Sequence, residues 1–209
     1  MPTKHKLSPS ASERFLVCSA SIQHTSDFSE SVYSLKGNLQ HEVGFLRLEQ
    51  LFKDKDNSKK LEELTDKTKW YYNKDKSLKV KWDNGCEKTV DEYVSYVKRL
   101  YNQFKPKIVF LEYRFNFMFY GYKMYGTADV AFVLENNDIV VIDLKTGRNK
   151  VETEDNSQML LYGLGFIQEV SKKLKSVPQN LIISICQPPA YNKEAIKYSL
   201  EQVMSWYKK

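Results

Sequence analysis

The sequence predicts an α/β fold, in which helices pack against a β-sheet. Residues 126–147 contain two runs rich in valine, isoleucine and phenylalanine on either side of Glu135, Asn136 and Asn137, a pattern typical of a β-hairpin. After the helices of its first half, the chain carries signals for three strands, a helix, a strand and a helix. Its 209 residues, of which 42% are hydrophobic, are enough for one domain with a core.

The composition limits the classes of protein to which the chain can belong. No apolar run is long enough to span a membrane, and the N-terminal residues lack the apolar stretch of a signal peptide. We therefore expect an intracellular, cytoplasmic protein with no membrane partner. The formal net charge of +6 favours an anionic partner such as nucleic acid, although many basic proteins bind none.

The three cysteines lie far apart in the sequence, as Cys18, Cys86 and Cys186. There is no Cys-x-x-Cys pair, which argues against a zinc site and against a disulfide framework. We therefore expect free thiols, either buried or on the surface.

The first predicted element is a short helix near Ser8. Ser8 fits the N-cap position, and Pro9 fits the first helical position, where its missing N–H costs no hydrogen bond. Phe15, Leu16 and Val17 would give this helix its apolar face.

Residues 35–52 predict a longer helix. One stripe along it, at helical spacing, carries His41, Phe45, Leu48 and Phe52. The stripe alone indicates a core histidine on an apolar face. The neighbouring Glu42 points about a quarter-turn away, where it either supports a site at His41 or lies on a solvated face of the helix.

Residues 53–89 are rich in lysine and poor in aliphatic side chains. Two interpretations stay open for this insertion. It is either solvated and partly mobile, or a flap that binds a nucleic-acid strand, with lysines on phosphates and aromatic rings stacked on bases. The aromatic residues available for stacking are Trp70, Tyr71, Tyr72 and Trp82.

Thr89 and Glu92 have the spacing of a capping box, so we expect an amphipathic helix to begin at Thr89. Its apolar positions continue to Phe104, and Pro106 ends it. We assign this helix a structural role.

Residues 108–119 alternate in the manner of a strand with one apolar face. The other face carries Glu112, Arg114 and Asn116. Glu112 either lies near the acidic residues of the following hairpin, as a further ligand or a supporting contact for a metal ion, or pairs with Arg114 on an exposed face. Gly121 then allows the turn into the next strand.

The hairpin places charged residues where burial is expected. Residues 139–144 are almost all apolar, as in a strand buried on both faces, yet they end in Asp143 and Lys145. If residues 135–137 form a three-residue loop, Asp129 lies opposite Asp143, and Lys145 shares their face. Two facing carboxylates are best explained by a divalent cation between them. A two-residue loop would instead put the two aspartates on opposite faces.

The residues after the hairpin remain polar. Residues 146–150 predict a basic turn whose backbone amides and Arg148 could hold a phosphate. In the helix that follows, Gln158 and Tyr162 lie one turn apart and share a face. On spacing alone they are either site residues or an amide and a phenol on an ordinary helix face.

The chain closes with a strand and a helix. Residues 181–187 are mostly apolar, as in a buried strand, and Pro188 and Pro189 stop it. Residues 194–207 predict an amphipathic helix.

Several blocks of sequence together resemble a known family. The main blocks are Gly126-Thr-Ala-Asp129, Ile142-Asp-Leu-Lys-Thr-Gly147 and Gln158-x-x-x-Tyr162. In this order and spacing they resemble the RecB-like branch of the PD-(D/E)XK nuclease superfamily. Gly37-x-x-x-His41 resembles the first motif of that branch, and residues 7–18 resemble the opening of RecB-like nucleases found in phages. The resemblance implies a restriction-endonuclease-like core, with a central mixed β-sheet flanked by helices, in a single nuclease domain over 1–209.

The resemblance also implies a metal site. His41, Asp129, Asp143 and the Leu144 carbonyl would hold Mg²⁺ or Mn²⁺, with the imidazole favouring Mn²⁺ as well as Mg²⁺. Lys145, beside the cation, would orient the attacking water or stabilise charge on the phosphate.

Further residues receive roles by the same resemblance. Gln158 and Tyr162 would complete the catalytic set by positioning the substrate or supporting Lys145. Arg148 would bind the substrate. Glu112 and Glu42 are candidates for supporting contacts around the site.

The expected activity is that of a metal-dependent DNA nuclease, with an exonuclease of phage-type recombination, repair or DNA processing as the leading hypothesis. The candidate partners are DNA and a recombination or helicase protein, in the host cytoplasm if the protein is viral. The alternatives are an endonuclease and a catalytically silent DNA-binding scaffold of the same fold. Iron–sulfur relatives add three late cysteines to an early one, and this chain has only Cys186 late, so we expect no cluster.

Overall fold

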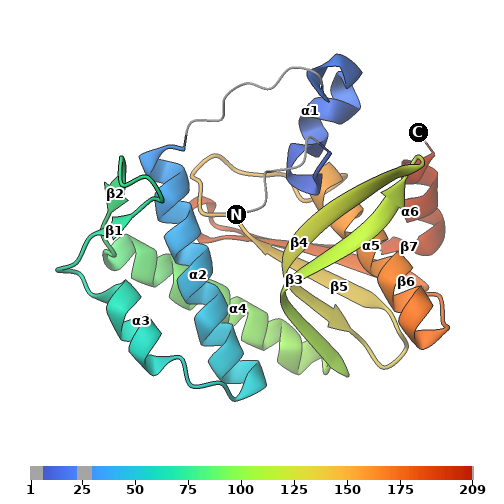
Figure 1. Ribbon diagram of the computed structural model, residues 1–209. Helices are drawn as coiled ribbons and strands as arrows, with labels where there is room; N and C mark the ends of the chain where they lie inside the picture. The colour runs from blue at the N-terminus through green and yellow to red at the C-terminus, as the bar shows by residue number, and fades with distance from the viewer. Residues whose placement is uncertain (1–6, 23–29, 209) are drawn as a thin grey trace.

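The computed structural model of the protein describes residues 7–22 and 30–208. At its centre is a five-stranded mixed sheet with the strand order β3-β4-β5-β6-β7 (Figure 1). β5 and β6 run parallel, and the other neighbouring pairs run antiparallel. The strands are β3 (Ile108–Phe119), β4 (Tyr122–Val133), β5 (Ile139–Leu144), β6 (Asn180–Gln187) and β7 (Asn192–Ser199).

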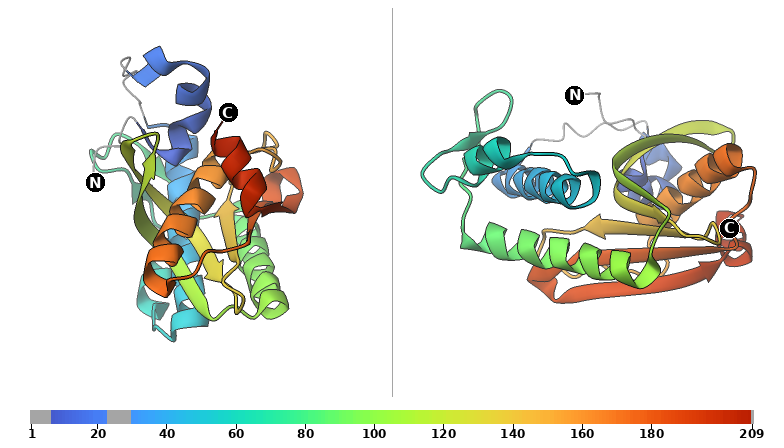
Figure 2. Two further views of the ribbon diagram at one scale, coloured as in Figure 1. Left: turned by 90° about the vertical axis from the view of Figure 1, so that its right-hand side faces the viewer. Right: turned by 90° about the horizontal axis from the view of Figure 1, so that it is seen from below.

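Helices cover both faces of this sheet, which confirms the predicted fold class. On one face, Phe166 of α5 and Val203 of α6 join inward side chains of the strands. On the other, Val97 of α4 and Leu48 of α2 do so. The right-hand view of Figure 2 shows α2 and α4 toward the left end of the molecule and α5 and α6 toward the right. These helices are α2 (Val32–Lys53), α4 (Asn84–Phe104), α5 (Ser157–Leu174) and α6 (Leu200–Tyr207).

None of the described helices is both long enough and apolar enough to span a membrane.

The register of the β4–β5 hairpin is the one predicted. Val133 pairs with Ile139, and the Leu134 N–H donates to the Asp138 carbonyl at 2.9 Å, so three residues form the loop. The same register brings Asp129 opposite Asp143, one step beyond the last paired residues. All six residues of β5 are buried, as expected for a strand covered on both faces.

The β3–β4 hairpin contains an irregularity at Glu112, which has φ of 44° within a strand. This left-handed conformation is rare for a residue with a side chain. The alternation of faces along β3 changes at this residue. Phe110 and Tyr113 are three positions apart, yet both pack on the α5 side of the sheet. The opposite strand changes face at the same place, where Ala128 and Ala131 share that side. The pair Glu112 and Asp129 therefore sits at a bend common to both strands.

Helix α4 begins earlier than predicted. Asp83 is its N-cap and accepts a hydrogen bond from the Cys86 N–H at 2.8 Å. Thr89 lies inside the helix, where its hydroxyl donates to the Gly85 carbonyl at 2.8 Å. The predicted capping box at Thr89 is therefore wrong, because Asp83 already caps the helix six residues upstream.

The closing helix over 194–207 is also wrong in its first half. Residues up to Ser199 form β7, an edge strand in which Ile196 pairs with Ile183 of β6. Residues 193–195 and Lys197 of β7 are exposed, and the glutamate, alanine and lysines among them do not favour a strand by intrinsic propensity. Pairing with β6 overrides those propensities. Helix α6 begins only after Ser199, whose side chain caps it.

The N-terminal helix differs from the expectation as well. Ser8 precedes a 3-10 turn, η1 (Pro9–Ala11), and its side chain makes no cap hydrogen bond; α1 (Ser12–Val17) begins after that turn. Phe15 is buried, but Leu16 and Val17 expose 45% and 88% of their surface. A helix of this length turns consecutive residues in different directions, so the three do not share one packed face. A short turn, η2 (Ser19–Ile22), follows.

Residues 53–89 contain three short elements beside α2 (Figure 1). Trp82 is 2% exposed and packs against α2, so its predicted availability for stacking on a base is wrong. Trp70 remains 46% exposed, with the ammonium groups of Lys79 and Lys81 at 4.5 and 4.7 Å from its ring centroid. The elements are α3 (Ser58–Thr65), β1 (Tyr71–Tyr72) and β2 (Lys79–Val80).

Candidate functional site

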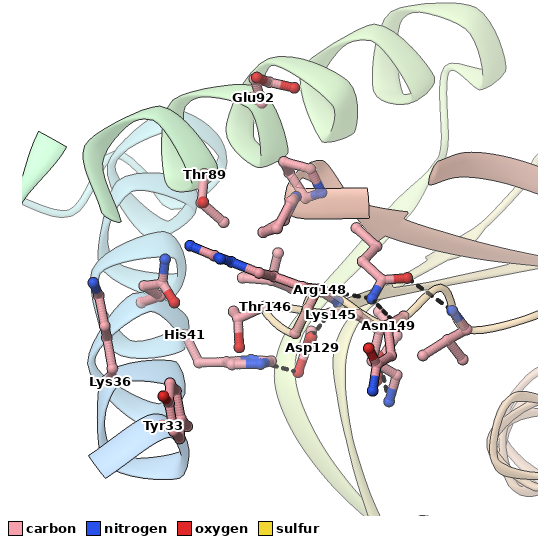
Figure 3. Close-up of a pocket in the computed structure, with 18 of the residues that line it drawn as sticks. Tyr33, Lys36, His41, Thr89, Glu92, Asp129, Lys145, Thr146, Arg148 and Asn149 are labelled. Atoms are coloured by element: carbon pink, nitrogen blue, oxygen red, sulfur yellow. Dashed lines mark hydrogen bonds and ion pairs between the residues drawn. The ribbon is translucent and has the colours of Figure 1, made fainter. Parts of the chain in front are cut away.

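Three possible metal ligands from three elements meet at the bend of the sheet. His41 of α2, Glu112 of β3 and Asp129 of β4 each offer one ligand atom, and these atoms lie within 4.8 Å of one another. His41 Nδ1 is 3.3 Å from Asp129 Oδ1 (Figure 3). The other oxygen of Asp129 accepts a hydrogen bond from the Leu144 N–H at 2.7 Å. This bond between β4 and β5 fixes the Asp129 carboxylate, and α2 brings the His41 ring beside it.

Gly37 explains how α2 comes close enough to bring His41 into this group. A Cβ atom at Gly37 would lie 2.9 Å from the Thr146 side-chain oxygen, which is closer than real Cβ contacts. Thr146 is the second residue after β5, so the absence of a side chain at position 37 lets the helix lie close to the end of that strand. His41 is one turn further along α2 and faces the same side.

A second group forms around Asp143, which is 4% exposed. Lys145 Nζ lies 3.0 Å from Asp143 Oδ2 and donates a hydrogen bond to Gln158 Oε1 at 2.8 Å. Gln158 Nε2 donates in turn to the Tyr162 hydroxyl at 3.0 Å and, more weakly, to Asp143 Oδ1 at 3.4 Å. Sharing one helix face thus allows Gln158 and Tyr162 to hold the ammonium group in place.

One oxygen of this second group has no hydrogen bond. Asp143 Oδ2 is buried, and no donor among the described residues meets it with hydrogen-bond geometry, although the Lys145 ammonium lies near. A buried carboxylate oxygen without a donor is costly. The Lys145 ammonium, 3.0 Å away, offsets part of that cost, and a divalent cation would offset it further.

The titration of the site follows from its crowded negative charge. Burial raises the pKa of Glu112 to about 7, and repulsion from Asp129 adds to the shift. Burial also raises the pKa of Asp143, against the opposing effect of Lys145. Burial alone would lower the pKa of His41, but the Asp129 carboxylate outweighs it and raises that pKa to about 9. The excess negative charge of the site therefore favours the binding of positive charge, either a proton or a cation.

The groups face a cavity of about 1150 Å³. Figure 3 shows α2 on one side of it, α4 above, and the segment after β5 on the floor. Asp129, Asp143, Leu144 and Lys145 line it together with exposed cationic residues. The basic residues at its wall are Lys36, Lys88 and Arg148, and the aromatic ones include Tyr33 and Tyr191.

Comparison with known proteins places the chain in a family. The family model described as "Protein of unknown function (DUF2800)" matches residues 5–209. The chain belongs to the DUF2800 family. No protein with a curated description matches this DUF2800 sequence.

Solved structures were found that resemble this DUF2800 protein to different degrees. One is from Eubacterium rectale and is named as a candidate exonuclease; it has a TM-score of 0.52 and 11% identity, and the match covers 98% of this chain and 77% of that one. A weaker match is the protein SSO0001, with a TM-score of 0.34 and 14% identity; the match covers 90% of this chain and 76% of that one. Another is the protein VC1899 from Vibrio cholerae, with a TM-score of 0.28 and 13% identity; the match covers 85% of this chain and 53% of that one. At 11% identity, the likeness to the Eubacterium rectale structure shows the fold alone.

Glu112 and Glu42, the two candidates for supporting contacts in this DUF2800 protein, lie in different places in the structure. Glu112 lies with His41 and Asp129, whereas the Arg114 guanidinium lies over the Tyr125 ring at 5.5 Å. Glu42 is not brought to the group. Its carboxylate lies 2.8 Å from Lys60 Nζ, on the side of the insertion.

Some lining residues carried no recognised signal in the sequence. Lys36 and Lys88 resemble other helix-surface lysines until the fold brings α2 and α4 to the same cavity. Gln187 is different, because it is a polar residue at the end of a buried apolar strand. The same reasoning that selected Asp143 would have selected it.

Proposed function

We propose that this protein is a metal-dependent DNA nuclease of the RecB-like type in the PD-(D/E)XK superfamily. The observation that carries the proposal is the convergence of His41, Glu112 and Asp129 beside the pair Asp143 and Lys145. These groups lie at a cavity with a basic wall, which suits a polyanionic substrate. The fold shared with the named candidate exonuclease from Eubacterium rectale is consistent with the proposal.

The donor set fits a divalent cation. His41, Asp129 and Asp143 with the Leu144 carbonyl would hold it, and the position of Glu112 adds a further carboxylate. Carboxylates suit Mg²⁺, and the imidazole extends the choice to Mn²⁺. The buried Asp143 oxygen that lacks a hydrogen bond supports the fit. The cation would lower the pKa of a bound water and neutralise charge on the scissile phosphate.

The remaining residues would position the substrate. Lys145 is held by Asp143 and Gln158, so its ammonium group is oriented before a phosphate arrives. The Tyr162 hydroxyl holds Gln158 in turn. Burial and the neighbouring Asp143 have opposite effects on Lys145, and the net result is a raised pKa, which keeps the group cationic. Arg148 would bind the strand at the cavity wall.

We further propose exonuclease action in phage-type DNA recombination, repair or processing, in the cytoplasm and with a recombination or helicase protein as partner. The support is the resemblance of residues 7–18 and of the three sequence blocks to stand-alone RecB-like nucleases. Residues 1–209 would form a single domain without an iron–sulfur cluster. Cys18, Cys86 and Cys186 are free thiols in the structure.

Cleavage of end-labelled linear DNA and of covalently closed circles tests this function. Each substrate is incubated with Mg²⁺, Mn²⁺ or EDTA, with the wild-type protein and with Asp143→Asn. Metal-dependent loss of linear DNA alone, absent in the variant, is the expected result, and cutting of circles would make the protein an endonuclease. Intact substrates under all conditions would reject a stand-alone enzyme and leave either a protein that a partner activates or the DNA-binding scaffold, for which Asp143→Asn and Lys145→Ala change no measured function.

A further inference from the structure

The segment between β5 and α5 is fixed by one buried side chain, that of Gln187. This residue is fully buried at the end of β6. Its Nε2 donates to the carbonyls of Gly147 and Asn149 at 2.9 and 2.7 Å, and its Oε1 accepts from the Val151 N–H at 2.9 Å. Both amide hydrogens and the carbonyl oxygen are therefore spent on the backbone of one short segment.

The far end of that segment has a second anchor. Asn192, which is 3% exposed, donates from Nδ2 to the Val151 carbonyl at 2.8 Å. The near end lies against α2 at the contact between Gly37 and Thr146. A loop held at both ends and in its middle is preorganised, so a ligand that binds it does not have to order it.

Of the exposed side chains on this fixed segment, Arg148 is the cationic one that lines the cavity. Figure 3 shows it extending across the cavity, toward the side on which Lys36 of α2 and Thr89 of α4 lie. Among the described residues, no carboxylate is paired with Arg148, whereas Lys150 of the same segment lies 3.2 Å from Glu152 and 3.3 Å from Glu194. Arg148 is thus the cation that the segment offers to the cavity.

The other charges around Arg148 are mostly neutralised within the protein. Lys36 lies 2.6 Å from Asp83, and Glu92, the acidic residue at the α4 wall, lies 2.6 Å from Lys193. Lys88 adds a further cation to the lining. The wall that Arg148 reaches therefore keeps an excess of positive charge, separate from the carboxylates that face Lys145.

We propose that Arg148, on the fixed segment 147–151, forms a subsite for a DNA phosphodiester that is not itself hydrolysed, and that Gln187 is a positioning residue that holds the segment. The Arg148 guanidinium can bind two phosphate oxygens at once, and binding of this kind is stronger when the orientation of the guanidinium is fixed beforehand. The inference rests on the proposed nuclease function for the identity of the ligand. The hydrogen bonds of Gln187 carry the positioning role.

Arg148→Gln tests the subsite, with Lys150→Gln as the matched control. Both variants remove one positive charge from the same exposed segment, so a difference between them reports the position of Arg148. A fluorescently labelled oligodeoxynucleotide is titrated in EDTA, where nothing is cleaved, over a range of salt concentrations. We expect Arg148→Gln to weaken binding roughly tenfold and to reduce the salt slope by about one, with little change for Lys150→Gln. Equal effects of the two substitutions would overturn the subsite.

A double substitution tests the role of Gln187. In Gln187→Glu, one carboxylate oxygen faces two carbonyls in place of the amide donor, which releases the segment. We expect Gln187→Glu to weaken oligonucleotide binding in the wild-type background but not in the Arg148→Gln background, while it lowers the melting temperature equally in both. Additive losses of affinity would show that Gln187 does not act through Arg148. If Gln187→Glu fails to fold, the comparison of Arg148→Gln with Lys150→Gln still decides the subsite.

The two proposals can fail separately. DNA binding that depends on Arg148, without cleavage under any metal, would reject the nuclease and keep an anion subsite. Metal-dependent cleavage with a KM that Arg148→Gln leaves unchanged would keep the nuclease and reject the subsite. If both hold, Arg148→Gln raises KM while kcat stays within about twofold, because the contact is made equally in the ground and transition states.

Discussion

At the scale of single residues, Glu112 combines an unfavourable backbone with a useful carboxylate. Its φ of 44° is costly for any residue with a Cβ atom, by about 1–2 kcal/mol. The same conformation places the side chain beside His41 and Asp129. Strain of this kind is common where a site requires a particular geometry.

Glu112→Gly separates these two effects. Glycine accepts the left-handed conformation and removes the repulsion with Asp129, so we expect the metal-free protein to gain about 1 kcal/mol in free energy of unfolding. Mn²⁺ should at the same time bind more weakly. Urea unfolding in EDTA and calorimetric titration with Mn²⁺ measure the two quantities. A less stable variant with unchanged Mn²⁺ affinity would contradict both expectations.

The pKa of His41, about 9 in the metal-free protein, predicts that metal and proton compete for its ring. At pH 8 the imidazole is mostly protonated, whereas Glu112, with a pKa of about 7, is mostly ionised. A cation can bind the ring only after it loses its proton, so Mn²⁺ affinity should rise with pH up to about 9. Titration calorimetry in two buffers of different ionisation enthalpy should detect about one proton released per ion. His41→Ala should abolish most of that release.

At the scale of elements, the distance between α2 and the end of β5 decides whether His41 reaches the site. Gly37→Ala places a methyl group against Thr146, while alanine improves helix propensity by up to about 1 kcal/mol. We therefore expect a small change in melting temperature and a clear loss of Mn²⁺ affinity. Gly44→Ala is the matched control, because its methyl group would meet the Tyr93 ring, in the packing of α2 against α4. That control should lose stability more than metal affinity.

The start of α4 can be tested in the same way. Asp83→Ala removes the N-cap and should cost about 1 kcal/mol of unfolding free energy, whereas Asp83→Asn keeps the cap and should cost less. Burial opposes the shift, but Lys36 and the Cys86 N–H lower the pKa of Asp83 to about 2. The stability it contributes is thus present above the unfolded-state pKa near 4 and is lost as pH falls toward 2. Urea unfolding at neutral and acid pH measures the difference.

At the scale of the whole molecule, the metal-free site leaves Asp129, Asp143 and Glu112 close together, so occupancy should stabilise the fold. A ligand at a hundred times its dissociation constant adds about 2.7 kcal/mol. We expect Mn²⁺ to raise the melting temperature and EDTA to reverse the rise. Asp129→Asn should abolish the shift without unfolding the protein. The same shift in that variant would place the ion elsewhere.

How much of this molecule the sequence could predict depends on the range of the interactions. The β4–β5 register and the face shared by Asp143 and Lys145 follow from a local turn and a period of two, so both were predictable. The left-handed Glu112 and strand β7 were not, because each is fixed by pairing with a neighbouring strand. The residues that form the cavity wall could not be predicted either, because long-range packing brings them together. Lys36 and Arg148 become neighbours of one cavity only through the packing of α2.

The parallel pairing of β5 and β6 has a consequence for how the molecule is made. Parallel neighbours require a crossover, here α5, so β6 is synthesised long after β5 and brings Gln187 to the loop from a distance in sequence. His41, Asp129 and Gln158 likewise come from three separate stretches of chain. A ribosome-bound chain that has not yet received β6 has the acidic hairpin but not the fixed loop beside it. Whatever chemistry the cavity performs is therefore withheld until β6 has been synthesised and has paired with β5.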